Sequence, residues 1–172
     1  MTSTLFRTFA ARQPSLPGLT FSQVNERILS DSGGSSFVTC FYGVLEPDTG
    51  RMRYVNAGHV PPLLVSAQKS KTIDRLGRTG MALGVLKDAA WQQKLVRFVP
   101  GDYMLFYTDG ILEAENAKGD FYGEQRLAQT ARQQSGAPAK VILEAILADV
   151  IRFSDNGPFN DDVVLMVLKK KP

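Results

Sequence analysis

The hydrophobic pattern of this chain changes its period at Gly33-Gly34, and that change restricts the folds that the chain can adopt. Before it, residues 1–30 carry apolar side chains at helical spacing on both sides of a break at Pro14–Gly18, which predicts a helical hairpin. After it, residues 37–168 are expected to form a mainly antiparallel sheet region with two C-terminal helices. No strong linker interrupts this order, so we expect one α/β (α+β) domain over residues 1–172.

Local signals mark the individual strands and helices. The predicted strands are 37–45, 51–55, 63–65, 91–98, 103–108 and 163–168. Asn56–His59 is expected to form a turn, and helices are expected to begin near Gly123 and near Pro138, which suits a first helical turn. Val163–Leu168 is apolar throughout, a pattern typical of a buried central strand.

Composition excludes several classes of protein. A chain of 172 residues with 44% hydrophobic residues can bury one sizeable core. The net charge of +3 is small, and Lys169–Lys171 is better explained as a solvated tail than as a nucleic-acid contact. No apolar run approaches the roughly 20 residues that cross a bilayer, and the first residues lack a secretory pattern. The single Cys40 excludes an internal disulfide, so we expect a cytoplasmic protein without membrane or nucleic-acid partners.

Carboxylates stand where two of the predicted strands meet loops. Asp109 follows the strand at 103–108, and Asp161-Asp162 precede the last apolar run. Two or three carboxylates with little His or Cys nearby suit Mg²⁺ or Mn²⁺, and a pair of such ions can activate water and clamp a phosphate. These residues therefore predict a phosphate-ester hydrolase in which Asp109 and Asp161 bind metal.

The same residues also have structural interpretations. Asp109-Gly110 could be an ordinary turn, in which Gly110 allows either close backbone approach or a positive φ. Asp161-Asp162 could be a polar loop end, and because adjacent side chains on an extended segment point to opposite faces, at most one would enter a site directly. His59, the only histidine, is expected to shape a loop through hydrogen bonds more than to catalyse. Cys40 lies in an apolar strand, and a zinc site of His and Cys ligands is not expected.

Several short motifs follow one another in a specific order. They are Phe37-Val38-Thr39, Tyr54-Val55-Asn56-Ala57-Gly58-His59, Pro100-Gly101-Asp102, Tyr107-Thr108-Asp109-Gly110, Glu113-Ala114, Tyr122-Gly123-Glu124 and Asp161-Asp162. In this order and at these spacings, from about Leu5 to Leu168, they resemble the SpoIIE/RsbU branch of the PPM-type, metal-dependent protein serine/threonine phosphatases.

The resemblance implies an α-β-β-α sandwich of two mainly antiparallel sheets flanked by helices. It also implies a dinuclear Mn²⁺ or Mg²⁺ centre that activates water for attack on phosphoserine or phosphothreonine. Asp109 matches the family's ligand in the Thr-Asp-Gly motif, and Asp161 matches its C-terminal Asp ligand, with Asp162 beside it. Asn56 and His59 match a family loop to which we assign a shaping role. The implied substrate is a bacterial regulatory protein such as an anti-sigma-factor antagonist.

Two departures from the family pattern qualify these expectations. Val163-Val164 stands where the family usually has a Thr close to the final motif. Family members also carry an Asp-rich strand and an Asp-Val-Ser-Gly-His-Gly-like motif before the helix at which this sequence starts, so we expect an N-terminally truncated domain without its first strands. An exposed sheet edge or the helical hairpin could then support a homodimer. The alternatives are a non-catalytic interaction module or inactive fragment that keeps the fold, and a small-molecule phosphohydrolase.

Overall fold

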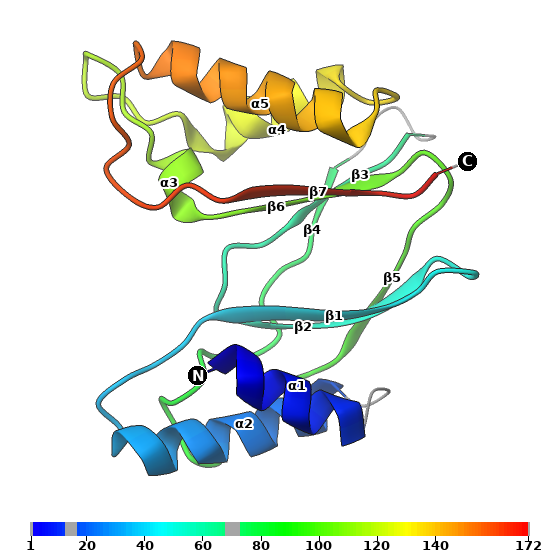
Figure 1. Cartoon of the computed structure of the whole chain (residues 1–172), viewed down its shortest axis with the longest axis vertical. Helices are drawn as coiled ribbons and strands as arrows, with labels where there is room; N and C mark the ends of the chain where they lie inside the picture. The colour runs from blue at the N-terminus through cyan, green and yellow to red at the C-terminus, as the bar shows by residue number, and fades with distance from the viewer. Residues whose placement is uncertain (1, 13–16, 68–72, 172) are drawn as a thin grey trace. The chain divides into compact units, whose positions relative to one another are not determined.

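The computed structural model describes residues 2–12, 17–67 and 73–171 as a mixed α/β structure with two antiparallel sheets (Figure 1). The chain divides into two compact units. The first contains Met1–His59 and Gly77–Arg97, and the second contains Val60–Leu76 and Phe98–Pro172. No helix in the described part of the chain is long and apolar enough to span a bilayer. One domain over residues 1–172 stays a prediction.

The first unit pairs a helical hairpin with a three-stranded sheet of order β1-β2-β5. Its elements are α1 (Thr2–Arg12), α2 (Pro17–Ser32), β1 (Cys40–Glu46), β2 (Arg51–Ala57) and β5 (Lys94–Arg97). The predicted hairpin is therefore present, with Met1 and residues 13–16 outside the described residues. The helix α2 begins earlier than expected, at Pro17, because proline is well suited to a first helical turn.

The aromatic core of the first unit explains the helical spacing in its sequence. Phe21 is fully buried, and its ring meets Phe6 of α1 edge-on at 4.9 Å between centroids. Val24 belongs to the same buried cluster as Val55 of β2, so the two helices cover one face of this sheet. The Trp91 ring lies 5.9 Å from Phe21 and donates its indole N–H to the Met81 carbonyl at 2.8 Å.

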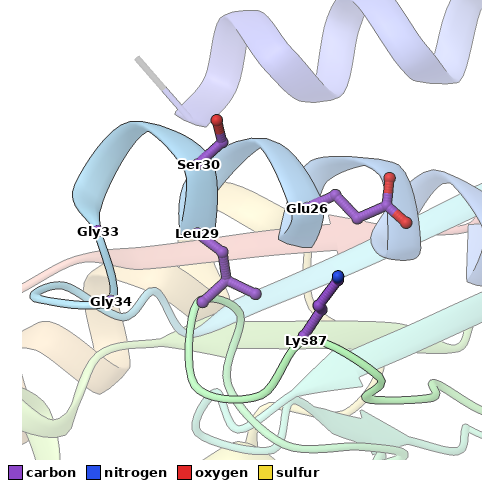
Figure 2. A pocket seen from close by; sticks show the side chains of 6 residues that line it. All are labelled: Glu26, Leu29, Ser30, Gly33, Gly34 and Lys87. Atoms are coloured by element: carbon purple, nitrogen blue, oxygen red, sulfur yellow. The ribbon is translucent and has the colours of Figure 1, made fainter.

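A buried asparagine joins α2 to a loop of the same unit. Asn25 donates its side-chain N–H to the Leu86 carbonyl at 2.8 Å, and its Oδ1 accepts from the Gly84 amide at 2.7 Å. Beside this loop, a hollow of about 430 Å³ lies at the C-terminal end of α2 (Figure 2). Its lining residues are Glu26, Leu29, Ser30, Gly33, Gly34 and Lys87.

The second unit places helices against a four-stranded sheet of order β4-β3-β6-β7. Its elements are β3 (Leu63–Val65), β4 (Ile73–Arg75), β6 (Tyr103–Tyr107), α3 (Asp109–Leu112), α4 (Gly123–Gln133), α5 (Ala139–Phe153) and β7 (Leu165–Lys169). Leu105 of β6, Leu127 of α4 and Ile146 of α5 are fully buried in one cluster. Both long helices begin within one residue of the predicted positions, Gly123 and Pro138.

Two elements differ from the sequence prediction in kind. The helix α3 begins at Asp109, where a loop was expected, because a single helical turn carries too few residues for a periodic pattern. The prediction of a central strand at Val163–Leu168 is wrong for this chain. β7 begins at Leu165 and lies at the edge of its sheet, and among the described strands it pairs with β6 alone. Met166 is accordingly 50% exposed.

Several boundaries also differ from the predicted ones. Val38 forms only an isolated bridge with Leu83, so β1 starts later than residue 37. Asn56 and Ala57 extend β2 into the predicted turn, because they pair with Phe41 and Cys40. The three-residue strand β4 was not predicted, since its short sequence holds no clear alternation.

Candidate metal centre

A rigid strand leads directly to Asp109. In β6, Tyr103, Leu105 and Tyr107 are buried, and the Tyr107 hydroxyl donates to the Pro61 carbonyl at 3.0 Å. Burial raises the pKa of Tyr107, and the neighbouring Glu124 raises it further, so this hydroxyl stays protonated as a donor. Asp109 is the exposed first residue of α3, and its carbonyl accepts from the Glu113 amide at 2.9 Å.

Thr108 joins the end of β6 to the segment that contains the second pair of carboxylates. Its hydroxyl donates to the Asp162 carbonyl at 2.7 Å and accepts from the Val164 amide at 2.9 Å. Its own amide donates to the Val164 carbonyl at 3.2 Å. We call these three hydrogen bonds the Thr108 clasp. The clasp brings two segments that are far apart in sequence into direct contact.

Gly110 lies against the same segment with no room for a side chain. A Cβ atom on Gly110 would lie 2.6 Å from the Asp162 carbonyl oxygen and 3.1 Å from that of Asp161. Real Cβ atoms do not approach backbone oxygens so closely. Of the two reasons considered for this glycine, the structure therefore supports close backbone approach.

Asp161 and Asp162 are both exposed, and they interact locally. The Asp162 amide donates to Asp161 Oδ1 at 2.7 Å, which orients the Asp161 carboxylate along the chain. Asn160 of this loop donates to Glu115 Oε2 at 3.4 Å, in the segment that follows α3. Asp155 and Asn156 follow the end of α5 in this loop, and their backbones have positive φ values of 53° and 60°.

The donor atoms suit a hard cation in kind but are few in number. Asp109 and Asp161 offer carboxylate oxygens, the ligands that Mg²⁺ and Mn²⁺ prefer. Across residues 2–12, 17–67 and 73–171, no three His, Cys, Asp or Glu side chains are grouped as a metal site. The residues therefore fit a partial ligand set for one cation and do not fit the full ligand set of a two-ion centre. The metal-binding roles of Asp109 and Asp161, with Gly110 and Asp162 beside them, stay predictions.

Asn56 and His59 belong to the first unit and contact each other there. Asn56 is fully buried, and its Oδ1 accepts from the His59 amide at 2.9 Å. The Asn56 amide also donates to Thr79 Oγ1 at 3.0 Å, and Gly58 has a positive φ of 73°. These contacts are of the kind that a loop-shaping role requires.

Cys40 of β1 is not suited to act as a nucleophile. Burial raises the pKa of the Cys40 thiol to about 11, which disfavours the nucleophilic thiolate.

Sequence reasoning did not single out Thr108 as a residue that organises the site. The hydroxyl of a threonine at the end of a strand can bond backbone groups of a neighbouring segment, but the sequence does not show which segment will be adjacent. In this chain the neighbour is Asp162–Val164.

Comparison with known proteins identifies the family. The family model described as Stage II sporulation protein E (SpoIIE) matches residues 1–171. Protein IcfG of Synechocystis sp. is 30% identical over 145 residues, which are 84% of this chain and 22% of that protein. Phosphoserine phosphatase RsbU of Bacillus subtilis is 26% identical over 155 residues, 90% of this chain and 45% of that protein. The chain thus spans less than half the length of either relative.

Solved structures show the same fold. The SiaA-PP2C domain of Pseudomonas aeruginosa superposes with a TM-score of 0.83 at 17% identity, over 98% of this chain and 67% of that one. This likeness confirms the predicted class, a mixed α/β fold with two antiparallel sheets and helices. Among the other similar structures, the SpoIIE phosphatase domain of Bacillus subtilis was presoaked with Mn, and RsbX was solved in complex with magnesium. By the family match and the relatives together, this chain belongs to the SpoIIE family, in the SpoIIE/RsbU branch of the PPM-type phosphatases.

Proposed function

We propose that this chain is part of a metal-dependent phosphatase that hydrolyses phosphoserine or phosphothreonine on a bacterial regulatory protein. The observation that carries the proposal is the Thr108 clasp, which holds the Asp109 turn against the Asp161-Asp162 segment. This contact between the two backbone segments supports a site in which acidic residues from two distant parts of the chain share one hard cation. Family membership supplies the reaction class, and the clasp supplies the reason for assigning it to these residues.

Each residue has a distinct part in this proposal. Asp109 and Asp161 would bind Mn²⁺ or Mg²⁺ through carboxylate oxygens, and Asp162 would orient a neighbouring ligand. A bound ion of this kind polarises a phosphoryl oxygen and activates water. Thr108 and Gly110 are positioning residues, because they keep the two backbone segments in contact and have no free group to offer the substrate.

The proposed substrate is a phosphorylated regulatory protein, and a phosphorylated anti-sigma-factor antagonist is the first candidate to test. The RsbU relative is named a phosphoserine phosphatase, which supports this substrate class over nucleotides or sugar phosphates. A phosphoprotein substrate of this type implies that the protein acts in the cytoplasm. A homodimer through the β7 edge or the α1–α2 hairpin is part of the same proposal.

The test compares variants in metal binding and in turnover. Calorimetric titration with Mn²⁺ and phosphate release from a phosphoserine peptide are measured for the chain and for Asp109→Asn and Asp161→Asn. We expect both variants to bind Mn²⁺ at least about tenfold more weakly and to lose turnover. Asp74→Asn is the matched control, because Asp74 is an exposed carboxylate on β4 of the same unit. Unchanged Mn²⁺ affinity in Asp109→Asn would refute the metal assignment.

A second function, a non-catalytic interaction module, is favoured by one observation. The described residues contain no group of three metal-binding side chains, and a two-ion centre needs more carboxylates than two. Such a module would bind the phosphoprotein with the same affinity in EDTA and in Mn²⁺, and it would release no phosphate. Turnover of nucleotides but not of phosphoprotein would instead indicate a small-molecule phosphohydrolase.

A further inference from the structure

We propose that the end of the β1-β2-β5 sheet next to the turn between β1 and β2 binds an acidic segment of a protein partner. The site consists of Arg51, Leu95 and Arg97, and we call it the arginine ledge. Arg51 of β2 and Arg97 of β5 are directly paired across the two antiparallel strands. Together with Thr49, they line a hollow of about 340 Å³. The proposal does not depend on the phosphatase activity, because all of these residues lie in the first unit.

The ledge lies on the face of the sheet that the helical hairpin covers elsewhere. Side chains alternate along a strand, so Arg51 shares a face with Val55, which packs in the core with α2. Arg97 and Leu95 share this face because they pair with Arg51 and Arg53. Arg51 and Arg97 are exposed, and Leu95 is 54% exposed. The helices therefore leave this end of the sheet open.

The positive charge of the ledge is only partly neutralised within its own unit: Glu46 of β1 is directly paired with Arg51, but Arg53 and Arg97 lie on the same face. Arg53 holds Glu46 in an ion pair at 2.6 Å, and the Thr49 hydroxyl donates to the other oxygen of Glu46 at 3.0 Å. Glu46 is thus already engaged on both oxygens. Among the ion pairs formed by the described residues, none includes Arg51 or Arg97.

Arg51 and Arg97 repel each other at directly paired positions, and Glu46, which lies opposite Arg51 but is already bound by Arg53, offsets only part of this repulsion. A carboxylate ligand would remove the repulsion, and the planar guanidinium matches a carboxylate in two parallel hydrogen bonds. Leu95 adds an apolar contact beside Arg97 on the same face, which suits a segment that alternates acidic and apolar side chains. A nucleic acid is a poorer match, because no aromatic side chain lines the hollow to stack on a base.

Fluorescence anisotropy with a labelled peptide of alternating Glu and Leu tests the ledge. The full chain is titrated in EDTA at low salt, so that the metal site plays no part. We expect Arg51→Gln and Arg97→Gln each to weaken binding about threefold, and the double variant about tenfold. Raising the salt should weaken binding by the wild-type chain and have less effect on the double variant. A peptide with Gln in place of Glu should bind at least tenfold more weakly.

Lys94→Gln is the matched control, because Lys94 is an exposed cation on the same strand whose side chain lies on the opposite face. It removes the same charge from the chain and should leave peptide binding unchanged. Equal binding by the wild-type chain and the double variant would overturn the proposal, as would an equal loss in Lys94→Gln. Tighter, Arg51-dependent binding of an oligothymidylate would also overturn it. Circular dichroism verifies that the double variant is folded.

Discussion

Gly110 stands at a position of the candidate site where only glycine fits without a steric clash. An added Cβ would meet the Asp162 carbonyl oxygen at 2.6 Å, and this oxygen is part of the Thr108 clasp. We therefore expect Gly110→Ala to lower the free energy of unfolding by about 1–3 kcal/mol, the range for an overpacked site. Urea unfolding measures the change. Gly77→Ala is the control, because nothing lies within 4 Å of a Cβ there, and its effect should stay within about 0.5 kcal/mol.

Thr108 acts at the same scale through its hydroxyl. Thr108→Val keeps the shape of the side chain but leaves the Asp162 carbonyl and the Val164 amide without this partner. We expect a loss of about 1 kcal/mol in the free energy of unfolding, because the site is partly open to water. If Asp109 and Asp161 share a cation, Mn²⁺ affinity should fall in the same variant. Thr108→Ser, which keeps the hydroxyl, should restore both quantities, and a failure to do so would show that the hydroxyl is not the cause.

At the scale of elements, β7 has the composition of a covered strand and the position of an edge strand. Its residues alternate between the core and the surface, with Val167 against the core and Met166 at 50% exposure. Edge strands usually carry charges or proline that prevent pairing with other chains, and β7 has neither before Lys169. Its free edge is therefore open to a second strand.

We expect the free edge of β7 to promote self-association at high protein concentration. Met166→Lys introduces an edge charge and should shift the sedimentation profile towards the monomer. Val141→Lys is the control, because Val141 is a similarly exposed apolar residue on α5 and not on a sheet edge. Equal effects of the two variants would show that general surface hydrophobicity, and not the edge, drives association.

At the scale of the whole molecule, the tyrosines make stability sensitive to alkaline pH. Burial raises the pKa of each of the 5 tyrosines above its ordinary value. Because the pKa of each tyrosine is higher in the folded than in the unfolded state, folding favours the neutral hydroxyl. The contribution of these hydroxyls to the free energy of unfolding is fully present below about pH 10 and is lost as the pH rises further. Urea unfolding between neutral pH and pH 12 should therefore show a falling free energy above about pH 10.

One variant isolates the contribution of a single tyrosine to this decline. The hydroxyl of Tyr122, which precedes α4, donates to Asp149 Oδ2 of α5 at 2.7 Å. Tyr122→Phe should be less stable than the parent at neutral pH, because this hydrogen bond is lost. Its stability should decline less steeply above pH 10, because one titrating group is gone. Parallel pH profiles for the two proteins would contradict the assignment.

Much of the fold could be predicted because its signals are local. The helices at Gly123 and Pro138 begin where first-turn residues and apolar spacing indicated, and the strand at Leu63–Val65 has the predicted bounds. A single turn such as α3 and a three-residue strand such as β4 carry too few residues for a periodic signal. These two elements were therefore not predicted.

The candidate site could be predicted in part for the same reason. Asp109 and Asp161 could be proposed as ligands because a carboxylate next to a strand end is visible in the sequence itself, and their metal-binding roles stay predictions. The role of Thr108 was not, because its hydrogen-bond partners lie more than fifty residues away along the chain. Arg97 gave no signal either, since its pairing with Arg51 depends on the register between two strands.

By itself the sequence determined the kinds of element, the family and the residue types that could bind a hard cation. These depend on the spacing of apolar side chains and on ordered motifs, which every part of the chain carries locally. The tertiary structure decided which segments touch: Gly110 against Asp162, Arg51 beside Arg97, and β7 at the edge of its sheet. Such contacts follow from strand register and packing between distant segments, and no local pattern encodes them.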